Sequence, residues 1–161
     1  MALKHLHEKL IIFGRLCIEN VLMFHAGMIK LGFNVYEEQV PLPFRSPEAL
    51  RGERQTQASD IYAAGVILYK LVYGVLPFTG SSEKEVLKKI KGKDYNEHYK
   101  ETHSPFMIVV SKEMQYLLES MLEYHEENRP SMEQLMGNIA FNFPIETDFN
   151  AYLKPKVNLL P

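Results

Sequence analysis

The chain has 161 residues, of which 46% are hydrophobic and 24% charged, so it is long and apolar enough to bury a core as one folded domain. Its net charge of −2, from 18 basic and 20 acidic side chains, gives no electrostatic reason to expect nucleic acid or an anionic membrane as a partner. The single cysteine, Cys17, excludes an internal disulfide framework, and the N-terminus lacks a signal-peptide core, so we expect a cytoplasmic protein.

The first residues, Ala2–Lys9, predict a short helix with Leu3, Leu6 and Leu10 towards one side. So few residues are marginal as an isolated helix. The segment therefore either docks on the core or is the end of a longer helix, and we favour the second interpretation.

Residues 11–31 predict a small β-hairpin. Two apolar runs, one ending in VLMF and the other beginning with MIKL, flank the turn His25-Ala26-Gly27. Apolar runs on both sides of a glycine-containing turn are typical of two short antiparallel strands.

The segment Ser59–Gly74, SDIYAAGVILYKLVYG, predicts a helix that is apolar on nearly every face and interrupted only by Lys70. Ser59 or Asp60 can cap its first amides, and Gly74 can adopt the left-handed closing conformation. Because a bilayer span needs about 20 apolar residues, this stretch is too short to cross a membrane. We expect this helix at the centre of the core.

Three further helices are predicted after the central one, and each has a serine at its N-terminal cap. Ser82 with Glu85 and Ser131 with Gln134 form the capping-box pattern, while Ser111 precedes the helix between them. Core packing accounts for their apolar stripes better than a binding groove does. The residues at helical spacing are Val86, Leu87 and Ile90, then Met114, Leu117, Leu118, Met121 and Leu122, then Met132, Leu135, Met136 and Ile139.

Two other segments have little regular pattern. Lys93–Met107 is a polar loop whose His98 and His103 have no cysteine or ordered carboxylate to complete a metal site, so no metal is expected. Residues 142–161 form a C-terminal tail, either strapped over the core or offered to a partner as a peptide.

Five runs of this chain, in order and at the right spacing, resemble the lower (C-terminal) lobe of the protein kinase superfamily. The family's helix E, catalytic loop and hairpin match LKHLHEKLIIFGRLCIENVLM; the approach to its Asp-Phe-Gly motif matches IKLGFN; its Ala-Pro-Glu motif matches FRSPEAL; its helix F matches SDIYAAGVILYKLVYGVLPF; its closing helices match MLEYHEENRPSMEQLM. The resemblance implies a mainly α, kinase C-lobe-like helical domain over residues 1–141, around a central buried helix and with a small β-hairpin.

The positions that carry chemistry in that family are degenerate here. Phe13, Gly14 and Arg15 stand at the His-Arg-Asp positions, so an arginine that cannot accept a proton replaces the catalytic base. Asn20 alone survives among the polar catalytic groups, and we also expect the family's ATP-gripping upper lobe to be absent. The resemblance thus implies a pseudokinase: not an enzyme, with no cofactor. The remaining degenerate positions are Cys17 for the catalytic-loop lysine, Gly32 for the magnesium-binding aspartate, Phe33, and Asn34 for the glycine that follows.

The positions that hold the fold together in that family are retained. Glu48 and Arg129 match its buried ion pair, and Asp60 matches the carboxylate that anchors helix F to the catalytic-loop backbone. Phe13 and Phe33 fall where the family stacks its regulatory spine of apolar side chains.

A degenerate kinase lobe is compatible with several functions. We favour a protein–protein interaction module, a scaffold or regulator, with Leu3, Leu6, Phe13 and Leu22 partly uncovered for a partner. Kinase non-catalytic C-lobe (KIND) domains, which bind peptide segments of partners, are similar in architecture. The alternatives are a decoy that inhibits an active kinase, a half-kinase completed in trans by another polypeptide, and a structural subunit of a larger assembly.

Overall fold

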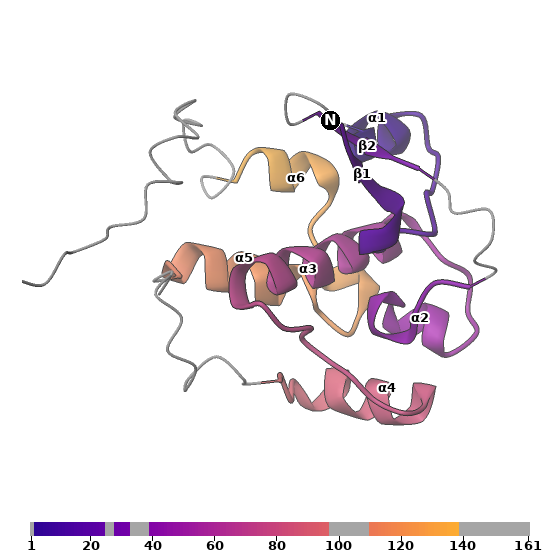
Figure 1. The fold of residues 1–161 in the computed structure, drawn as a ribbon, viewed down its shortest axis with the longest axis vertical. Helices are drawn as coiled ribbons and strands as arrows, with labels where there is room; N and C mark the ends of the chain where they lie inside the picture. Colours follow the sequence, from indigo (N-terminus) through magenta and orange to yellow (C-terminus); the bar gives the residue numbers. More distant parts are fainter. Residues whose placement is uncertain (1, 25–27, 33–38, 97–109, 139–161) are drawn as a thin grey trace, which may run out of the picture.

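The computed structural model describes residues 2–24, 28–32, 39–96 and 110–138, and these residues form a mainly helical domain with one two-stranded sheet (Figure 1). This confirms the predicted fold class. The helices are α1 (Ala2–Glu8), α2 (Pro47–Leu50), α3 (Gln57–Tyr73), α4 (Glu83–Gly92), α5 (Lys112–Met121) and α6 (Met132–Met136), and the strands are β1 (Val21–Met23) and β2 (Ile29–Leu31). The short 3-10 turns are η1 (Ile18–Asn20), η3 (Leu42–Phe44) and η4 (Glu126–Asn128).

Helix α3 is the central element of the fold. It contacts α5, η3 and η4, and Ile61, Tyr62 and Val66 on it are at most 1% exposed. In Figure 1, α1, the hairpin and α6 lie above α3, while α4 lies below it. The prediction that the helix is buried all round is too broad, because Leu71 in its last turn is 73% exposed.

The two ends of α3 differ from each other in how well the sequence predicted them. Gly74 closes the helix in the left-handed conformation, with φ 76°, as predicted. The N-terminal cap is Thr56 rather than Ser59 or Asp60. Thr56 and Ser59 form a reciprocal capping box, in which the Thr56 amide donates to Ser59 Oγ at 3.0 Å.

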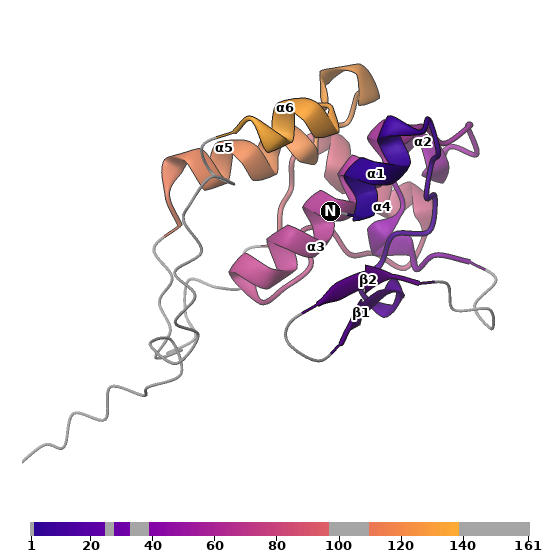
Figure 2. The same ribbon diagram turned by 90° about the horizontal axis from the view of Figure 1, so that it is seen from above.

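The predicted hairpin is present, and its strands are antiparallel with Leu22 opposite Lys30. The turn His25-Ala26-Gly27 lies outside the described residues. In the view from above (Figure 2), α3 lies between the hairpin on one side and α5 and α6 on the other. The hairpin therefore borders the central helix without covering its whole length.

Helix α1 is docked on the core. Leu3 and Leu6 pack against the buried Phe13, Leu16 and Ala63, and the helix contacts α6 and β2. The segment therefore docks on the core, and the favoured interpretation, that it is the end of a longer helix, stays a prediction. The placement of Leu10 on the same face is wrong, because the chain turns there with φ 58° and leaves its side chain 85% exposed.

The three later helices begin at the predicted serines. Ser111 Oγ accepts from the Met114 amide, and Ser131 with Gln134 makes the predicted capping box. The box at Ser82 is only half formed. Ser82 Oγ accepts a hydrogen bond from the Glu85 amide. The Glu85 carboxylate, however, accepts from the amide of Ser81, at 2.8 Å, and not from that of Ser82.

The stripes of these helices fill the core. Val86 and Ile90 of α4 pack with Tyr62 and Phe78 in the largest buried cluster, and Leu117, Met121 and Leu135 surround Ile61 in a second. Several predictions lie outside the described residues: the histidines of the loop after Lys93, Ile139, and the boundary between residues 1–141 and the tail 142–161.

Two negative findings apply to the described part of the chain. None of its helices combines the length and the apolar composition that a membrane crossing requires. Within the same residues, no group of three or more histidine, cysteine, aspartate or glutamate side chains is placed to hold a metal ion.

Candidate functional site

The loop that resembles the kinase catalytic loop is anchored to α3 through Asp60. The amides of Phe13 and Gly14 donate to the Asp60 carboxylate at 2.8 and 2.7 Å. Asp60 is 1% exposed, so these charge-assisted hydrogen bonds form without competition from water. Gly14 has φ 69°, and a Cβ there would lie 2.8 Å from Gln55 Oε1, so a glycine suits this turn. The predicted anchoring contact of Asp60 is thus present.

His7 is a further partner of Asp60 that the sequence analysis did not identify. Its Nε2 lies 2.9 Å from Asp60 Oδ2, and its side chain is 6% exposed. The sequence indicated only that His7 lies on the same side of α1 as Leu3, because the two residues are four positions apart. Asp60 consequently joins α1, the loop and α3 in one buried polar contact.

Asn20 orders the other end of the loop. Its Nδ2 donates to the backbone carbonyl of Arg15 at 2.6 Å, and the residue is 5% exposed. The Arg15 side chain is exposed to solvent. The backbone around the position of the family's base is therefore held from both sides.

Cys17, at the position of the catalytic-loop lysine, is 1% exposed. Burial and the hydrogen bond that it shares with Glu19 raise the pKa of its thiol to about 11. The side chain is therefore neutral at physiological pH. It provides no positive charge for a phosphate and no thiolate nucleophile.

Gly32, at the position of the magnesium-binding aspartate, would need the exposed Leu22 side chain to move before it could carry a side chain. Its amide donates to the Asn20 carbonyl at 2.9 Å, and a Cβ built on it would lie 2.6 Å from Leu22 Cδ1. Leu22 thus occupies the space beside it. Phe33 and Asn34 lie outside the described residues, so the stacking of Phe33 stays a prediction.

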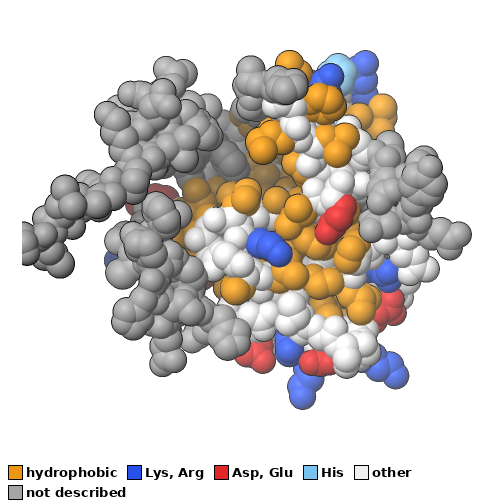
Figure 3. Space-filling view, in the orientation of Figure 1, with side chains coloured by type: hydrophobic (Ala, Val, Ile, Leu, Met, Phe, Trp, Pro, Cys, Tyr) orange, Lys and Arg blue, Asp and Glu red, His pale blue; other side chains and the backbone are white. Residues whose placement is uncertain are grey.

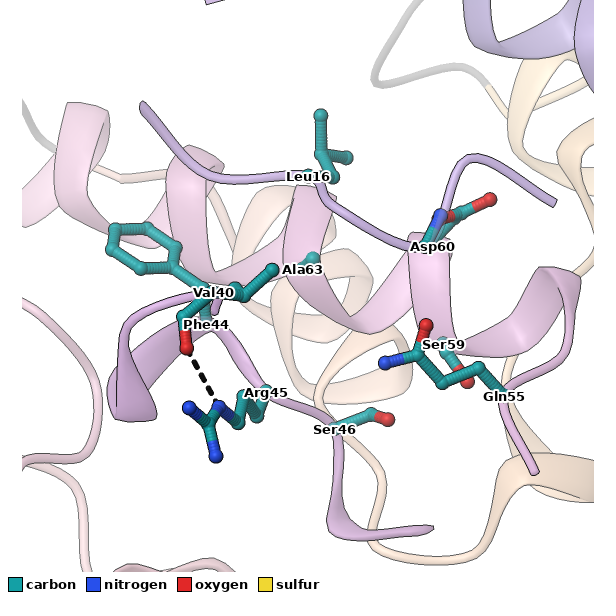
Figure 4. Close-up of a pocket in the computed structure, with 10 residues that line it drawn as sticks. Leu16, Val40, Phe44, Arg45, Ser46, Gln55, Ser59, Asp60 and Ala63 are labelled. Atoms are coloured by element: carbon teal, nitrogen blue, oxygen red, sulfur yellow. Dashed lines mark hydrogen bonds between the residues drawn. The ribbon is translucent and has the colours of Figure 1, made fainter. Parts of the chain in front are cut away.

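The magnesium site that kinase chemistry uses lacks one of its ligands here. Gly32 supplies no carboxylate, whereas the hydrogen bond from Asn20 to the Arg15 carbonyl involves only Nδ2 and not Oδ1, the type of atom that binds a metal. The cavity beside the loop, lined by residues of the loop, of 40–46 and of α3, measures only about 20 Å³. Figure 4 shows it between Leu16, Phe44, Ser59 and Ala63, with Arg45 bonded to the Val40 carbonyl. It has room for about one water molecule.

Glu48 and Arg129 form the predicted buried ion pair. Two parallel hydrogen bonds of 2.8 Å join the guanidinium to the carboxylate, and Ser59 Oγ donates to Glu48 Oε1 at 2.6 Å. The two residues are 2% and 6% exposed. The remaining guanidinium hydrogens donate to the carbonyls of Ala58, Glu123 and Tyr124.

The surroundings of Glu48 act on its acidity in opposite directions. Burial alone raises the pKa of a carboxyl group, but the hydrogen bonds from Arg129 and Ser59 outweigh it and lower the pKa of Glu48 to about 2. Every polar group of the pair has a partner, which is the condition under which a buried ion pair is tolerated.

The predicted exposure of four apolar residues is only partly right. Leu22 is 44% exposed, Leu3 and Leu6 are half-buried, and Phe13 is buried in the cluster below α1. Four of the exposed apolar residues that were not singled out from the sequence belong to the hairpin and its flanks. They are Met23 (80% exposed), Phe24 (48%), Met28 (55%) and Ile29 (62%). We call these four and Leu22 the hairpin patch.

Comparison with known proteins matches residues 1–139 to the protein kinase domain family. Among curated proteins, the chain is 33% identical over 106 residues to the mouse serine/threonine-protein kinase N3, covering 58% of this chain and 12% of that protein. It is 37% identical over 99 residues to a probable cAMP-dependent protein kinase catalytic subunit of Encephalitozoon cuniculi, covering 55% and 30%. It is 31% identical over 102 residues to the zebrafish ribosomal protein S6 kinase alpha-6, covering 56% and 14%. The matches therefore span between 12% and 30% of the length of these relatives.

Proposed function

The chain belongs to the protein kinase domain family, and from that membership we propose that it is a catalytically inactive member that acts as a protein–protein interaction module. The observation that carries the proposal is the state of the catalytic loop. Asp60 and Asn20 hold its backbone in place, while Arg15 stands where the family has its base. A side chain that stays protonated in proteins cannot accept the proton of a substrate hydroxyl.

Two further positions support inactivity. Phosphoryl transfer depends on placing the reactants and stabilising charge, chiefly through metal ions and cationic groups. The buried neutral Cys17 provides no such cation, and Leu22 fills the space beside Gly32 where the family has a metal ligand. Restoring chemistry would therefore require several coordinated changes.

The hairpin patch supports binding of another polypeptide. Its five apolar side chains are between 44% and 80% exposed. The register, with Met23 opposite Ile29 and Leu22 opposite Lys30, places Met23 and Ile29 on one face of the hairpin and Leu22 on the other. Hydrophobic side chains gather on the face shown in Figure 3, in the area that α1, α3 and the hairpin occupy in Figure 1. Exposed apolar surface on a folded domain is typical of an interaction site. KIND domains remain a parallel in function, by analogy of architecture.

The first experiment asks whether the chain is inactive. The purified chain, with magnesium and ATP, should transfer no phosphate to itself or to a generic basic peptide, and magnesium-ATP should not raise its melting temperature. The Asn20→Ala variant provides the contrast. Phosphate transfer that this variant loses would overturn the proposal and favour the half-kinase completed in trans.

The second experiment asks whether the hairpin patch binds a partner. Proteins that co-purify with the chain from its own cells should be lost with Met23→Glu/Ile29→Glu and retained with Leu10→Glu. Leu10 is a matched control, because it is also apolar and is 85% exposed, away from the hairpin. Equal recovery with both variants would contradict a partner site on the hairpin.

A decoy is a more specific form of the same function. The hairpin patch could occupy the upper lobe of an active kinase, in which case adding the chain should lower that kinase's activity. Met23→Glu/Ile29→Glu should relieve the inhibition. If the partners recovered are not kinases and no kinase is inhibited, the scaffold form of the proposal is favoured.

A further inference from the structure

We propose that the cavity beside the loop is a binding site for one water molecule, held by the hydroxyl group of Ser46. This water joins three segments that are separate in the sequence: residues 40–46, the turn before α3, and α3 itself at Asp60. The inference goes beyond the proposed function and does not depend on it, because it concerns the folded chain without a partner.

The hydroxyl group of Ser46 is buried and has no partner. The residue is 2% exposed, and its Oγ makes no hydrogen bond in the described part of the chain. Most buried hydroxyl groups in native structures are hydrogen-bonded, to protein or to ordered water, because an unsatisfied one destabilises the fold. The kinase family has alanine at this position of its Ala-Pro-Glu motif, so the hydroxyl is a departure of this chain from the motif. It therefore requires its own explanation.

The space beside this hydroxyl has the size of one water molecule. Ser46 lines the cavity of about 20 Å³ beside the loop, and a water needs at least about 10–15 Å³ of such free space. In Figure 4, the Ser46 hydroxyl and the side-chain amide of Gln55 point into the space between them. The volume excludes larger polar ligands, so water is the occupant that fits.

Gln55 and Asp60 provide the other partners that a water needs. Both line the cavity, and in the described part of the chain the Gln55 side chain makes no hydrogen bond. Among the described hydrogen bonds, Asp60 Oδ1 accepts only from the Gly14 amide, at 2.7 Å, and a carboxylate oxygen can accept a second one. Together with Ser46, these residues give the water about three partners, the usual number for a buried water.

Two other polar side chains of the cavity wall already have partners. Arg45 Nε donates to the Val40 carbonyl at 2.6 Å, and Ser59 Oγ donates to Glu48 Oε1 at 2.6 Å. These bonds fix the wall of the cavity without using the Ser46 hydroxyl. They therefore leave that hydroxyl to the water.

Tyr62 provides an internal comparison. Its hydroxyl is the other buried side-chain oxygen that lacks a partner in the described part of the chain, and the residue is 0% exposed. Tyr62 does not line the cavity at Ser46, and its ring packs in the largest buried cluster. Two hydroxyl groups with the same deficit therefore differ in whether this cavity lies beside them.

A crystal structure of the full chain tests the proposal directly. At a resolution of about 2 Å or better, one ordered water should lie within about 3 Å of Ser46 Oγ and of a side-chain atom of Gln55 or Asp60. The Ser46→Ala variant should lose this water or bind it at lower occupancy. Three results would overturn the proposal: a direct hydrogen bond between Ser46 and Gln55, no density in the cavity, or a peak surrounded by about six oxygen ligands, as for a metal cation.

Urea denaturation of two variants provides a second test, in which the water decides the sign of the effect. Ser46→Ala takes one partner from the water and should raise the equilibrium constant of unfolding about tenfold. Tyr62→Phe removes an unsatisfied hydroxyl and should leave that constant unchanged or lower it. The two changes are matched, because each deletes a single buried oxygen.

Both variants should fold, since alanine is the family's residue at the position of Ser46 and phenylalanine keeps the ring of Tyr62. A Ser46→Ala variant that is as stable as the natural chain, or more stable, would show that the Ser46 hydroxyl binds no water and would overturn the proposal. Neither measurement involves ATP or a partner, so its failure is distinct from failure of the proposed function.

Discussion

The Glu48–Arg129 pair and the loop around Arg15 are both inherited from the same family, yet one is kept and the other replaced. Glu48 and Arg129 are 2% and 6% exposed. They make two hydrogen bonds to each other and four to other groups, which are Ser59 Oγ and the carbonyls of Ala58, Glu123 and Tyr124. Arg15 is exposed. Losing one partner of a buried pair leaves a desolvated charge, whereas changing an exposed side chain costs little. Burial thus accounts for the difference between this pair and Arg15, although Phe13 and Cys17, at two other replaced positions, are also buried.

The largest effect should come from breaking the buried pair. We expect Arg129→Ala to lower the free energy of unfolding by about 3–5 kcal/mol, because Glu48 is left buried without its counter-charge. Urea denaturation measures it. Arg51→Ala is the matched control, because Arg51 also binds a carboxylate, that of Glu53 at 2.7 Å, but at the surface. The free energy of unfolding of this control variant should be nearly unchanged. Similar losses in the two variants would remove the distinction between buried and exposed positions.

Acid should weaken the same pair without a mutation. The pKa of Glu48 is about 2 in the folded chain and 4.5 in the absence of the fold. The unfolded chain therefore takes up the proton first, so the stabilisation is complete above about pH 5 and is lost as the pH falls towards 2. This difference corresponds to about 3 kcal/mol. Denaturation between pH 2 and pH 7 measures it, and Glu48→Gln should flatten the curve. An unchanged slope in that variant would assign the acid sensitivity to other carboxylates.

Removing the anchor of the loop should have a somewhat smaller effect. Asp60→Asn keeps the size of the side chain but presents an NH₂ group to the amides of Phe13 and Gly14 or to His7. We expect a loss of about 2–3 kcal/mol, with faster hydrogen exchange at the two amides. Asp94→Asn, at an exposed aspartate, is the control and should change stability by less than about 0.5 kcal/mol. Unchanged exchange at Phe13 and Gly14 would mean that Asp60 does not position the loop.

The smallest effect should come from the degenerate position itself. We expect Arg15→Ala to change the free energy of unfolding by less than about 0.5 kcal/mol, because the side chain is exposed and its backbone is held independently by Asn20. Thermal and urea denaturation of the natural and variant chains measure it. A loss as large as that of Asp60→Asn would show that Arg15 has become a structural residue and would end the contrast between the two regions.

Local signals predicted the ends of several elements correctly. Gly74, Ser111 and the Ser131–Gln134 pair act at the positions expected, because capping depends on the residue itself and on amides within three or four positions of it. The N-terminus of α3 is different. Ser59 does accept a hydrogen bond near it, but its hydroxyl hydrogen goes to Glu48, and Asp60 is bound to the loop of residues 13 and 14. The side chains of Ser59 and Asp60 bind groups that are distant in the sequence, and Thr56 is the N-terminal cap of α3.

The candidate site shows the same division. Residue types and spacing were sufficient to match Glu48 with Arg129 and Asp60 with the loop, because these residues lie within motifs of the kinase family. They could not reveal that His7 reaches Asp60, that Leu22 fills the space beside Gly32, or that Leu10 turns away from the core. These facts depend on how elements far apart in the chain approach one another.

The sequence by itself determined where five of the six described helices lie, where most of them are capped, which family the chain resembles and which reacting groups were replaced. These properties depend on residue identity and on neighbours along the chain. Only the tertiary structure decided which side chains are buried, where the hairpin patch is exposed, and that α1, α3, α6 and the hairpin leave an apolar groove between them. Burial and grooves are produced by packing between elements, and packing geometry depends on all of the contacting side chains at once.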